Sequence, residues 1–359
     1  MTDGQPVQPP APAAPPAEPG HNLKGPFEAT VLFNKTLRKC FCRMGLQFTG
    51  AGAEAFAKTR PGQFAQFDLS HISLPAPETI PDDLKDDASR QILLRRPFSF
   101  ARVAKEVIPP AHSGAGPASH SAAHPSTHIG AGKIIVEVVY CVLGPATLRM
   151  TTLVKGNTIN IIGPLGNGFT VPAGKKRAIL VAGGMGSPPL EHLAQVLTAE
   201  HPTLDAIAFA GAKTKDDLSF ERPLDNLSQE IGFWLGEFAR YSISSFVATD
   251  DGSAGFKGFV SNCITDWLSQ NSITLNPAET IIYACGPRSM LATIAKLARD
   301  KKIDCQISME EMMACGIGLC QSCAVKCVAP GGVPAGDKGE KYKLCCKDGP
   351  VFDAKEIVF

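Results

Sequence analysis

The chain has 359 residues, a length typical of two or three domains. Its 35 Lys and Arg residues nearly balance 34 Asp and Glu residues, and this net charge of +1 argues against nucleic acid or an anionic membrane as a partner. No apolar run approaches the roughly 20 residues that span a bilayer. The first residues also lack the basic and then apolar layout of a signal peptide, so we expect a cytoplasmic protein.

The first half of the chain divides into a tail and a strand-rich region. Residues 1–25 are rich in Pro and Ala and have too few branched or aromatic side chains for a core, which predicts disorder. Residues 26–172 contain short segments rich in Val, Ile, Phe and Thr, separated by Gly and Pro. This pattern indicates a small β-barrel or β-sandwich.

A low-complexity stretch at residues 109–132 interrupts the strand-rich region. Its last three histidines are four residues apart, a spacing that could place them on one face of a metal-binding helix. Pro125 and the surrounding glycines and serines oppose a helix, so we favour a solvated loop. The histidines in this stretch are His112, His120, His124 and His128.

Strands and helices are predicted to alternate over residues 173–302. RAILVAGG at 177–184 is typical of a buried strand, and the helix that follows is predicted to begin with Ser187 as its cap and with prolines in its first turn. Two further amphipathic helices are predicted within 258–270 and at 288–301. This alternation, with apolar strands, indicates a doubly wound parallel sheet.

The last 55 residues hold seven of the twelve cysteines. Three of them follow the spacing Cys315-x4-Cys320-x2-Cys323, and Cys346 follows after 22 residues, which matches plant-type [2Fe–2S] proteins. Glycines at 316 and 318 suit a loop that wraps closely around a cluster. A zinc site or buried free thiols are the alternatives, and Cys327 and Cys345 are near enough in the chain to compete as ligands.

A second motif, LRRPFS at residues 94–99, suits a dinucleotide cofactor. The Arg96 guanidinium can bind a pyrophosphate through two N–H groups, and the Ser99 hydroxyl can reach a ring nitrogen. Downstream, Thr147 is predicted to open a short helix whose amino end faces a phosphate. A surface turn is the alternative for LRRPFS.

A third group of residues lies where predicted strands end. Gly183, Gly184 and Gly186 come between a strand and a helix, and Cys285 and Gly286 follow another strand. Ligands of parallel sheets bind at the carboxyl ends of the strands, so these residues are expected to lie together beside a nucleotide. The alternatives are a close-packed turn for the glycines and a buried small side chain for Cys285.

These motifs occur in the order found in the ferredoxin-reductase superfamily. The chain resembles most closely the iron–sulfur flavoprotein, electron-transfer subunits of type B dihydroorotate dehydrogenases. The resemblance extends over about residues 27–359. Its matching stretches are PGQF (61–64), LLRRPFSF (93–100), IIGPLGNGF (161–169), VAGGMGSPPL (181–190), TDDGSAGFKGFV (249–260), YACGPRSML (283–291), MEEMMACGIGLCQSC (309–323) and CKDGPVF (346–352).

The resemblance implies three domains: an FAD-binding antiparallel β-barrel at 26–172, an NAD-binding α/β domain at 173–302 and a small [2Fe–2S] domain at 303–359. It implies cluster ligation by Cys315, Cys320, Cys323 and Cys346, with Cys346 preferred over Cys345. The implied NAD site contains Gly183, Gly184, Gly186, Cys285 and Gly286. The implied FAD contacts are Arg96, Pro97, Phe98, Ser99, Val139, Tyr140, Cys141, Ala146 and Thr147.

The resemblance also implies a function. FAD would exchange a hydride with NAD and single electrons with the cluster, which would relay them to an FMN-containing catalytic subunit that oxidises dihydroorotate in pyrimidine biosynthesis. We expect a heterotetramer with two copies of each chain, and no dihydroorotate oxidation by this chain alone. The alternatives are the reductase subunit of a hydrogenase, sulfide dehydrogenase or ferredoxin:NADP oxidoreductase, and, more distantly, a zinc-stabilised scaffold without catalysis.

Overall fold

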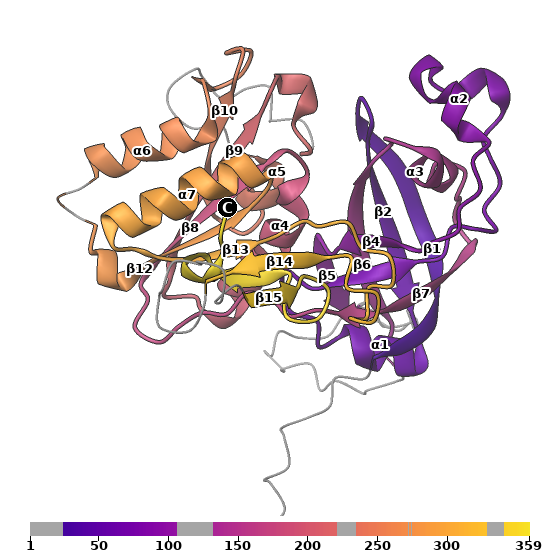
Figure 1. Cartoon of the computed structure of the whole chain (residues 1–359), viewed down its shortest axis with the longest axis horizontal. Coiled ribbons are helices and arrows are strands. Elements are labelled where there is room, and N and C mark those ends of the chain that lie inside the picture. Colours follow the sequence, from indigo (N-terminus) through magenta and orange to yellow (C-terminus); the bar gives the residue numbers. More distant parts are fainter. Residues whose placement is uncertain (1–23, 106–131, 221–234, 272, 274, 329–340) are drawn as a thin grey trace, which may run out of the picture.

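The computed structural model describes residues 24–105, 132–220, 235–271, 273, 275–328 and 341–359. The predicted N-terminal tail and the histidine-containing stretch lie outside these ranges, apart from residues 24, 25 and 132. The described residues form an antiparallel sheet and a largely parallel sheet that lie beside each other, with a two-stranded sheet between them (Figure 1). This arrangement is the β plus α/β architecture that the sequence predicts.

The first sheet has seven antiparallel strands in the order β4-β3-β7-β1-β2-β6-β5. Its inner face buries alternate apolar side chains, and Phe48 and Phe56 stack there with ring centroids 3.9 Å apart. The elements are β1 (Gly25–Arg38), β2 (Phe41–Phe48), α1 (Gly50–Phe56), β3 (Phe64–Phe67), α2 (Lys85–Ala88), β4 (Arg96–Ser99), β5 (Arg102–Lys105), β6 (Ile134–Cys141), α3 (Pro145–Met150) and β7 (Thr158–Leu165).

The second sheet has the order β11-β10-β9-β8-β12-β13-β16, and all its strands are parallel except β16. Six of the seven residues of β8 are buried, as expected for a strand covered on both faces. The elements are β8 (Arg177–Gly183), α4 (Ser187–Glu200), β9 (Asp205–Ala212), α5 (Gly236–Ala239), β10 (Ser244–Thr249), β11 (Phe256–Lys257), α6 (Val260–Gln270), β12 (Thr280–Cys285), α7 (Arg288–Lys301), β13 (Asp304–Ser308) and β16 (Val351–Asp353).

Helices cover both faces of the parallel sheet, which confirms the doubly wound prediction. Side chains of α6 and α7 pack in one apolar core, and side chains of α4 and α5 pack in another. The helix predicted at 288–301 matches α7, and α6 lies within the predicted 258–270.

The predicted cap of α4 is wrong by one residue. Ser187 already has helical dihedrals and is the first residue of the helix, while Gly186 occupies the cap position. The Ser187 hydroxyl lies 2.6 Å from that of Ser219, so its side chain joins two segments rather than capping backbone N–H groups. The prolines that follow do lie in the first turn, as predicted.

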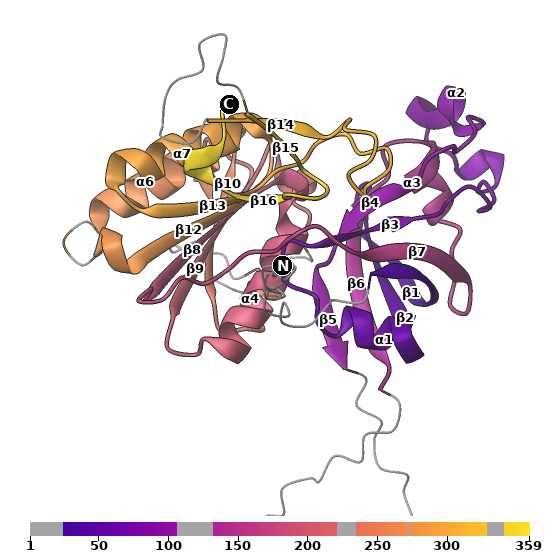
Figure 2. The ribbon, with the colours of Figure 1, turned by 60° about the horizontal axis from the view of Figure 1, so that its bottom comes forward.

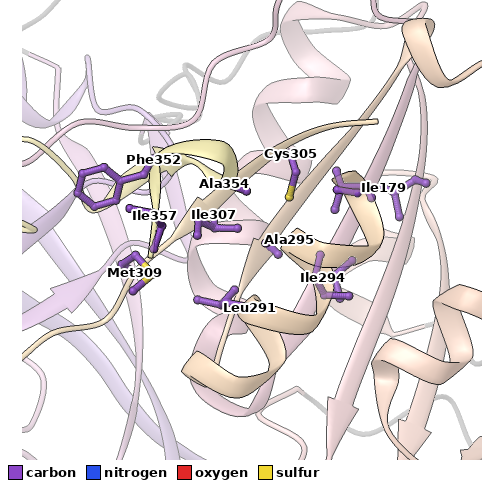
Figure 3. Packing of buried hydrophobic residues seen from close by; sticks show 14 of the residues in the cluster. Ile179, Leu291, Ile294, Ala295, Cys305, Ile307, Met309, Phe352, Ala354 and Ile357 are labelled. Carbon is purple, nitrogen blue, oxygen red and sulfur yellow. The ribbon is translucent and has the colours of Figure 1, made fainter. Parts of the chain in front are cut away.

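The C-terminal segment is attached to the edge of the parallel sheet. Strands β14 (Ala324–Cys327) and β15 (Lys341–Leu344) form a two-stranded antiparallel sheet, and β16 then pairs with β13. Phe352 and Ile357 belong to the same buried cluster as Leu291 of α7 and Ile307 of β13 (Figure 3). This packing fixes both ends of the cysteine-containing segment on the nucleotide side, while its loop passes toward the barrel near β4 (Figure 2).

Candidate cofactor sites

A cavity of about 440 Å³ lies between the barrel, the parallel sheet and the segment that follows β13. All nine residues assigned to FAD by resemblance line it, together with Cys285 from the assigned NAD set. This volume is in the range of cofactor and small-molecule sites. The nine residues are Arg96, Pro97, Phe98, Ser99, Val139, Tyr140, Cys141, Ala146 and Thr147.

Strand β4 presents the Arg-Pro-Phe-Ser motif at one edge of the barrel sheet. Pro97 lacks a backbone N–H, and an edge strand tolerates that loss because one of its sides has no partner strand. Ser99 pairs with Phe64 of β3, and both line the cavity because opposed residues of an antiparallel pair share a face. The half-buried Arg96 guanidinium donates a hydrogen bond to the Leu94 carbonyl oxygen at 2.8 Å. Its remaining N–H groups fit a cofactor phosphate.

The short helix near the phosphate position is present, but Thr147 does not open it. Helix α3 begins two residues earlier at Pro145, a position where the missing N–H of proline costs no helical hydrogen bond. The Thr147 side-chain oxygen instead accepts hydrogen bonds from the backbone N–H groups of Leu143 at 3.0 Å and Gly144 at 3.3 Å. These two bonds hold the turn that forms this part of the cavity wall.

The assigned glycines pack the junction between the ends of β8 and β12. A Cβ atom on Gly186 would lie 2.0 Å from the Cys285 carbonyl oxygen, and one on Gly286 would lie 2.9 Å from the Gly183 Cα atom. Close packing of the backbone therefore explains why glycine is needed at these three positions, and their place beside a nucleotide stays a prediction. Gly184 differs, because its φ is +52° and a Cβ there would meet nothing within 4 Å. Open space beside Gly184 suits a ligand that approaches the backbone.

Cys285 ends β12 and contributes to the cavity wall from the nucleotide side. Burial raises the pKa of its thiol to about 12, and the Ser308 hydroxyl beside it acts weakly in the opposite direction. The thiol is therefore protonated at neutral pH, which suits a neutral neighbour of a nicotinamide ring rather than a thiolate nucleophile.

Residues of two further segments line the cavity although they were not assigned to a cofactor from the sequence. One segment runs from the end of β8 into the first turn of α4, and the other begins at the last residue of β13. The rule that places ligands at the carboxyl ends of parallel strands would have pointed to both, since β13 lies next to β12. These residues are Met185, Pro188, Pro189, Ser308, Met309, Glu310, Glu311 and Met313.

The cysteine loop begins directly after this segment. Its backbone turns through positive φ at Gly316 (+70°) and Gly318 (+86°), conformations that glycine adopts without strain. The Cys320 backbone N–H donates a hydrogen bond to the Cys315 Sγ atom at 3.4 Å, and the Cys346 N–H does the same to the Cys323 Sγ atom. The four assigned ligands thus lie in two pairs.

Two pairs of thiols suit a [2Fe–2S] group better than zinc. Each iron of such a group takes two of the four cysteine ligands, whereas zinc needs all four around one ion. A hydrogen bond with the Ser322 side chain lowers the pKa of the exposed Cys320 thiol to about 6, which favours the ligating thiolate.

The competing cysteines have other surroundings. The Cys345 side chain is fully buried, and its Sγ atom donates a hydrogen bond to the Met309 carbonyl oxygen at 3.4 Å. Cys327 is buried in strand β14, and its Sγ contacts the Val325 carbonyl oxygen. Both thiols are hydrogen-bonded to backbone oxygens, as packed thiols are.

Two family models match the chain. The iron-sulfur cluster binding domain of dihydroorotate dehydrogenase B matches residues 310–358, which include all four assigned cluster ligands. The oxidoreductase NAD-binding domain matches residues 180–296, which include the glycine junction and Cys285.

Curated relatives extend this match. The dihydroorotate dehydrogenase B (NAD(+)) electron transfer subunit of Caldanaerobacter subterraneus subsp. tengcongensis is 35% identical over 224 residues, which are 62% of this chain and 76% of the relative. The chain belongs to this family. A second member, from Geobacillus sp. (strain WCH70), is 37% identical over 217 residues, which are 60% of this chain and 71% of that relative.

Solved structures of other proteins have folds similar to that of this electron transfer subunit. The structure of an NADH-dependent reduced ferredoxin-NADP oxidoreductase has a TM-score of 0.59 and 21% identity, and the match covers 92% of this chain and 89% of that one. The CS-b5R domains of human Ncb5or have a TM-score of 0.51 and 13% identity, with 79% and 69% covered. Both likenesses concern the fold alone. Among the described residues, no helix combines the length and hydropathy that a membrane span requires.

Proposed function

We propose that this chain is the electron transfer subunit of an NAD-linked dihydroorotate dehydrogenase and acts in pyrimidine biosynthesis. The observation that carries the proposal is the shared cavity, whose wall includes Ser99 of the barrel, Cys285 of the nucleotide sheet and Met313 beside the cysteine loop. A cofactor in that cavity would touch all three parts of the chain. FAD, when bound, exchanges a hydride with a nicotinamide and single electrons with an iron–sulfur group.

Separate groups of residues are assigned to FAD, to NAD and to the [2Fe–2S] group. We assign FAD to the nine cavity residues of the barrel, with the Arg96 guanidinium and the turn before α3 at its phosphates. We assign NAD to the junction of Gly183, Gly184, Gly186, Cys285 and Gly286 at the sheet edge. The four cysteines at 315, 320, 323 and 346 would hold the [2Fe–2S] group, with backbone N–H groups directed at two of their sulfurs.

The partner is proposed to be an FMN-containing dihydroorotate dehydrogenase catalytic subunit. Large apolar side chains are exposed in the cysteine loop and just before it: Met312 is 88% exposed, Leu319 77% and Ile317 49%. Such side chains are typical of the centre of a protein interface. An interface here would place the [2Fe–2S] group next to the catalytic subunit. We further propose that the complex contains two copies of each chain. We place it in the cytoplasm, because twelve free thiols fit a reducing compartment.

The proposal is tested by mixing the purified chain with its candidate catalytic subunit. NAD reduction driven by dihydroorotate should require both chains, whereas this chain alone should oxidise NADH with an artificial acceptor such as ferricyanide. Formation of orotate by the isolated chain would refute the division of labour. Activity with a hydrogenase or sulfide-oxidising partner, and none with the dihydroorotate-oxidising chain, would move the protein to another branch of the superfamily.

A further inference from the structure

Gln66 is a fully buried side chain whose amide has no partner. It lies on β3 with 0% of its surface exposed, and neither its Nε2 nor its Oε1 atom has a hydrogen-bond partner in the described part of the chain. More than nine in ten buried polar groups are satisfied, because leaving one unsatisfied destabilises the folded chain. A buried amide with two unsatisfied atoms therefore points to a group that is bound in the working protein.

Gln66 lies beside the cysteine loop and outside the wall of the assigned FAD cavity. It pairs with Pro97 of β4, so it shares the outward face of the barrel sheet with a residue of the cavity wall. Its amide lies against the first turn of the cysteine loop, because a Cβ atom on Gly316 would come within 2.3 Å of the Gln66 Nε2 atom. Gly316 is buried and directly follows Cys315. Gln66 itself is not part of the cavity wall, so its amide is closer to the loop than to the assigned FAD site.

We propose that Gln66 is a positioning residue that tunes the [2Fe–2S] group, with its amide N–H donating a hydrogen bond to a sulfur at the Cys315 end of the loop. This inference rests on the proposed function, since it requires the cysteine loop to be loaded. The group gains a negative charge when it is reduced, so a donor to its sulfurs stabilises the reduced form and raises its reduction potential. Gln66 lies on β3, which pairs with the strand that carries the FAD motif. The proposed hydrogen bond would therefore run from the barrel to the group held by the cysteine loop.

The test compares Gln66→Met, which keeps the length of the side chain and removes its polar atoms, with Gln66→His, which keeps an N–H donor. Redox titration followed by electron paramagnetic resonance should show that the Met variant retains its iron. At fixed potential its ratio of reduced to oxidised cluster should fall about tenfold, which equals about 59 mV for a one-electron couple. The His variant should stay closer to the wild type, and the flavin potential should not move in either.

The matched control is Gln306→Leu, which removes an amide on strand β13 of the other sheet that bonds to Thr170 and should leave the cluster potential unchanged. An unchanged cluster potential in Gln66→Met would overturn the proposal, as would a shift of the flavin potential alone. Loss of iron from both Gln66 variants would also overturn it, because it would show a packing role. A wild-type chain without iron would instead refute the proposed function itself.

Discussion

Cys345 and Cys346 are neighbours in the chain, but the structure gives their side chains different surroundings. The Cys346 backbone N–H is hydrogen-bonded to the Cys323 Sγ atom, which places this residue beside the loop. The Cys345 thiol is turned into the apolar core toward the Met309 carbonyl oxygen, and burial raises its pKa above the usual range. Spacing alone left both residues open as the fourth ligand, because it does not reveal which way a side chain points.

This difference predicts opposite results for two serine substitutions. Cys346→Ser should lose most of the iron and the visible absorption of the purified chain, because a hydroxyl is a poor replacement for a thiolate ligand. Cys345→Ser should keep both and lose only some stability, because it buries a hydroxyl at a packed position. Iron and acid-labile sulfide per chain measure the outcome. Loss of iron only from the Cys345 variant would show that the assignment is reversed.

At the scale of elements, a buried ion network joins strands of the barrel to helices of the nucleotide sheet. Arg43 of β2 is 2% exposed and bonds to Glu191 of α4 through two contacts of 2.7 and 3.0 Å. The same guanidinium lies 2.9 Å from Glu137 of β6 and 3.4 Å from Glu237 of α5. The network fixes the two sheets relative to each other, and thereby the two sides of the cavity.

The network predicts that Arg43→Met destabilises the protein strongly. Removing the guanidinium takes the shared counter-ion from three buried carboxylates, although Arg102 still pairs with Glu137 and Arg240 lies 3.7 Å from Glu191. Breaking a buried ion pair typically costs about 3–5 kcal/mol. Lys39→Met is the matched control, because Lys39 also joins the barrel to the nucleotide-binding part through Asp217 but is 60% exposed, so its loss should destabilise the protein far less. Denaturant unfolding of both variants gives the comparison. Equal losses would show that the buried network has no special part in holding the sheets together.

Sequence patterns predicted local elements well and long-range contacts poorly. Helix α7 follows from its amphipathic repeat, and the strand β8 follows from an apolar run, because both patterns are local. The position of Arg43 could not be predicted, since its partners come from three elements that meet only in the fold. The cap of α4 was predicted one residue too late, at Ser187 instead of Gly186. A serine near the start of an apolar helix gives the same sequence pattern whether it precedes the helix or is its first residue.

At the scale of the whole molecule, the cavity depends on the pairing of distant segments. Strand β16 pairs with β13 near the end of the chain, and this pairing positions the Met309–Met313 segment between the barrel and the cysteine loop. The residues assigned to FAD from the sequence all line this cavity, but the motifs did not indicate that the segment at 309–313 forms one of its walls. Its place in the wall depends on β13 lying next to β12 and on β16 pairing with β13, and local sequence patterns do not specify these strand neighbours.

On this model of function, one chain holds FAD and a [2Fe–2S] group that exchange electrons with NAD. The most direct test is a visible spectrum of the purified chain with flavin, iron, sulfide and zinc analysis, before and after NADH is added without oxygen. We expect one flavin and one [2Fe–2S] group per chain, with flavin absorption that NADH bleaches. A colourless chain that contains zinc and neither iron nor flavin would contradict it.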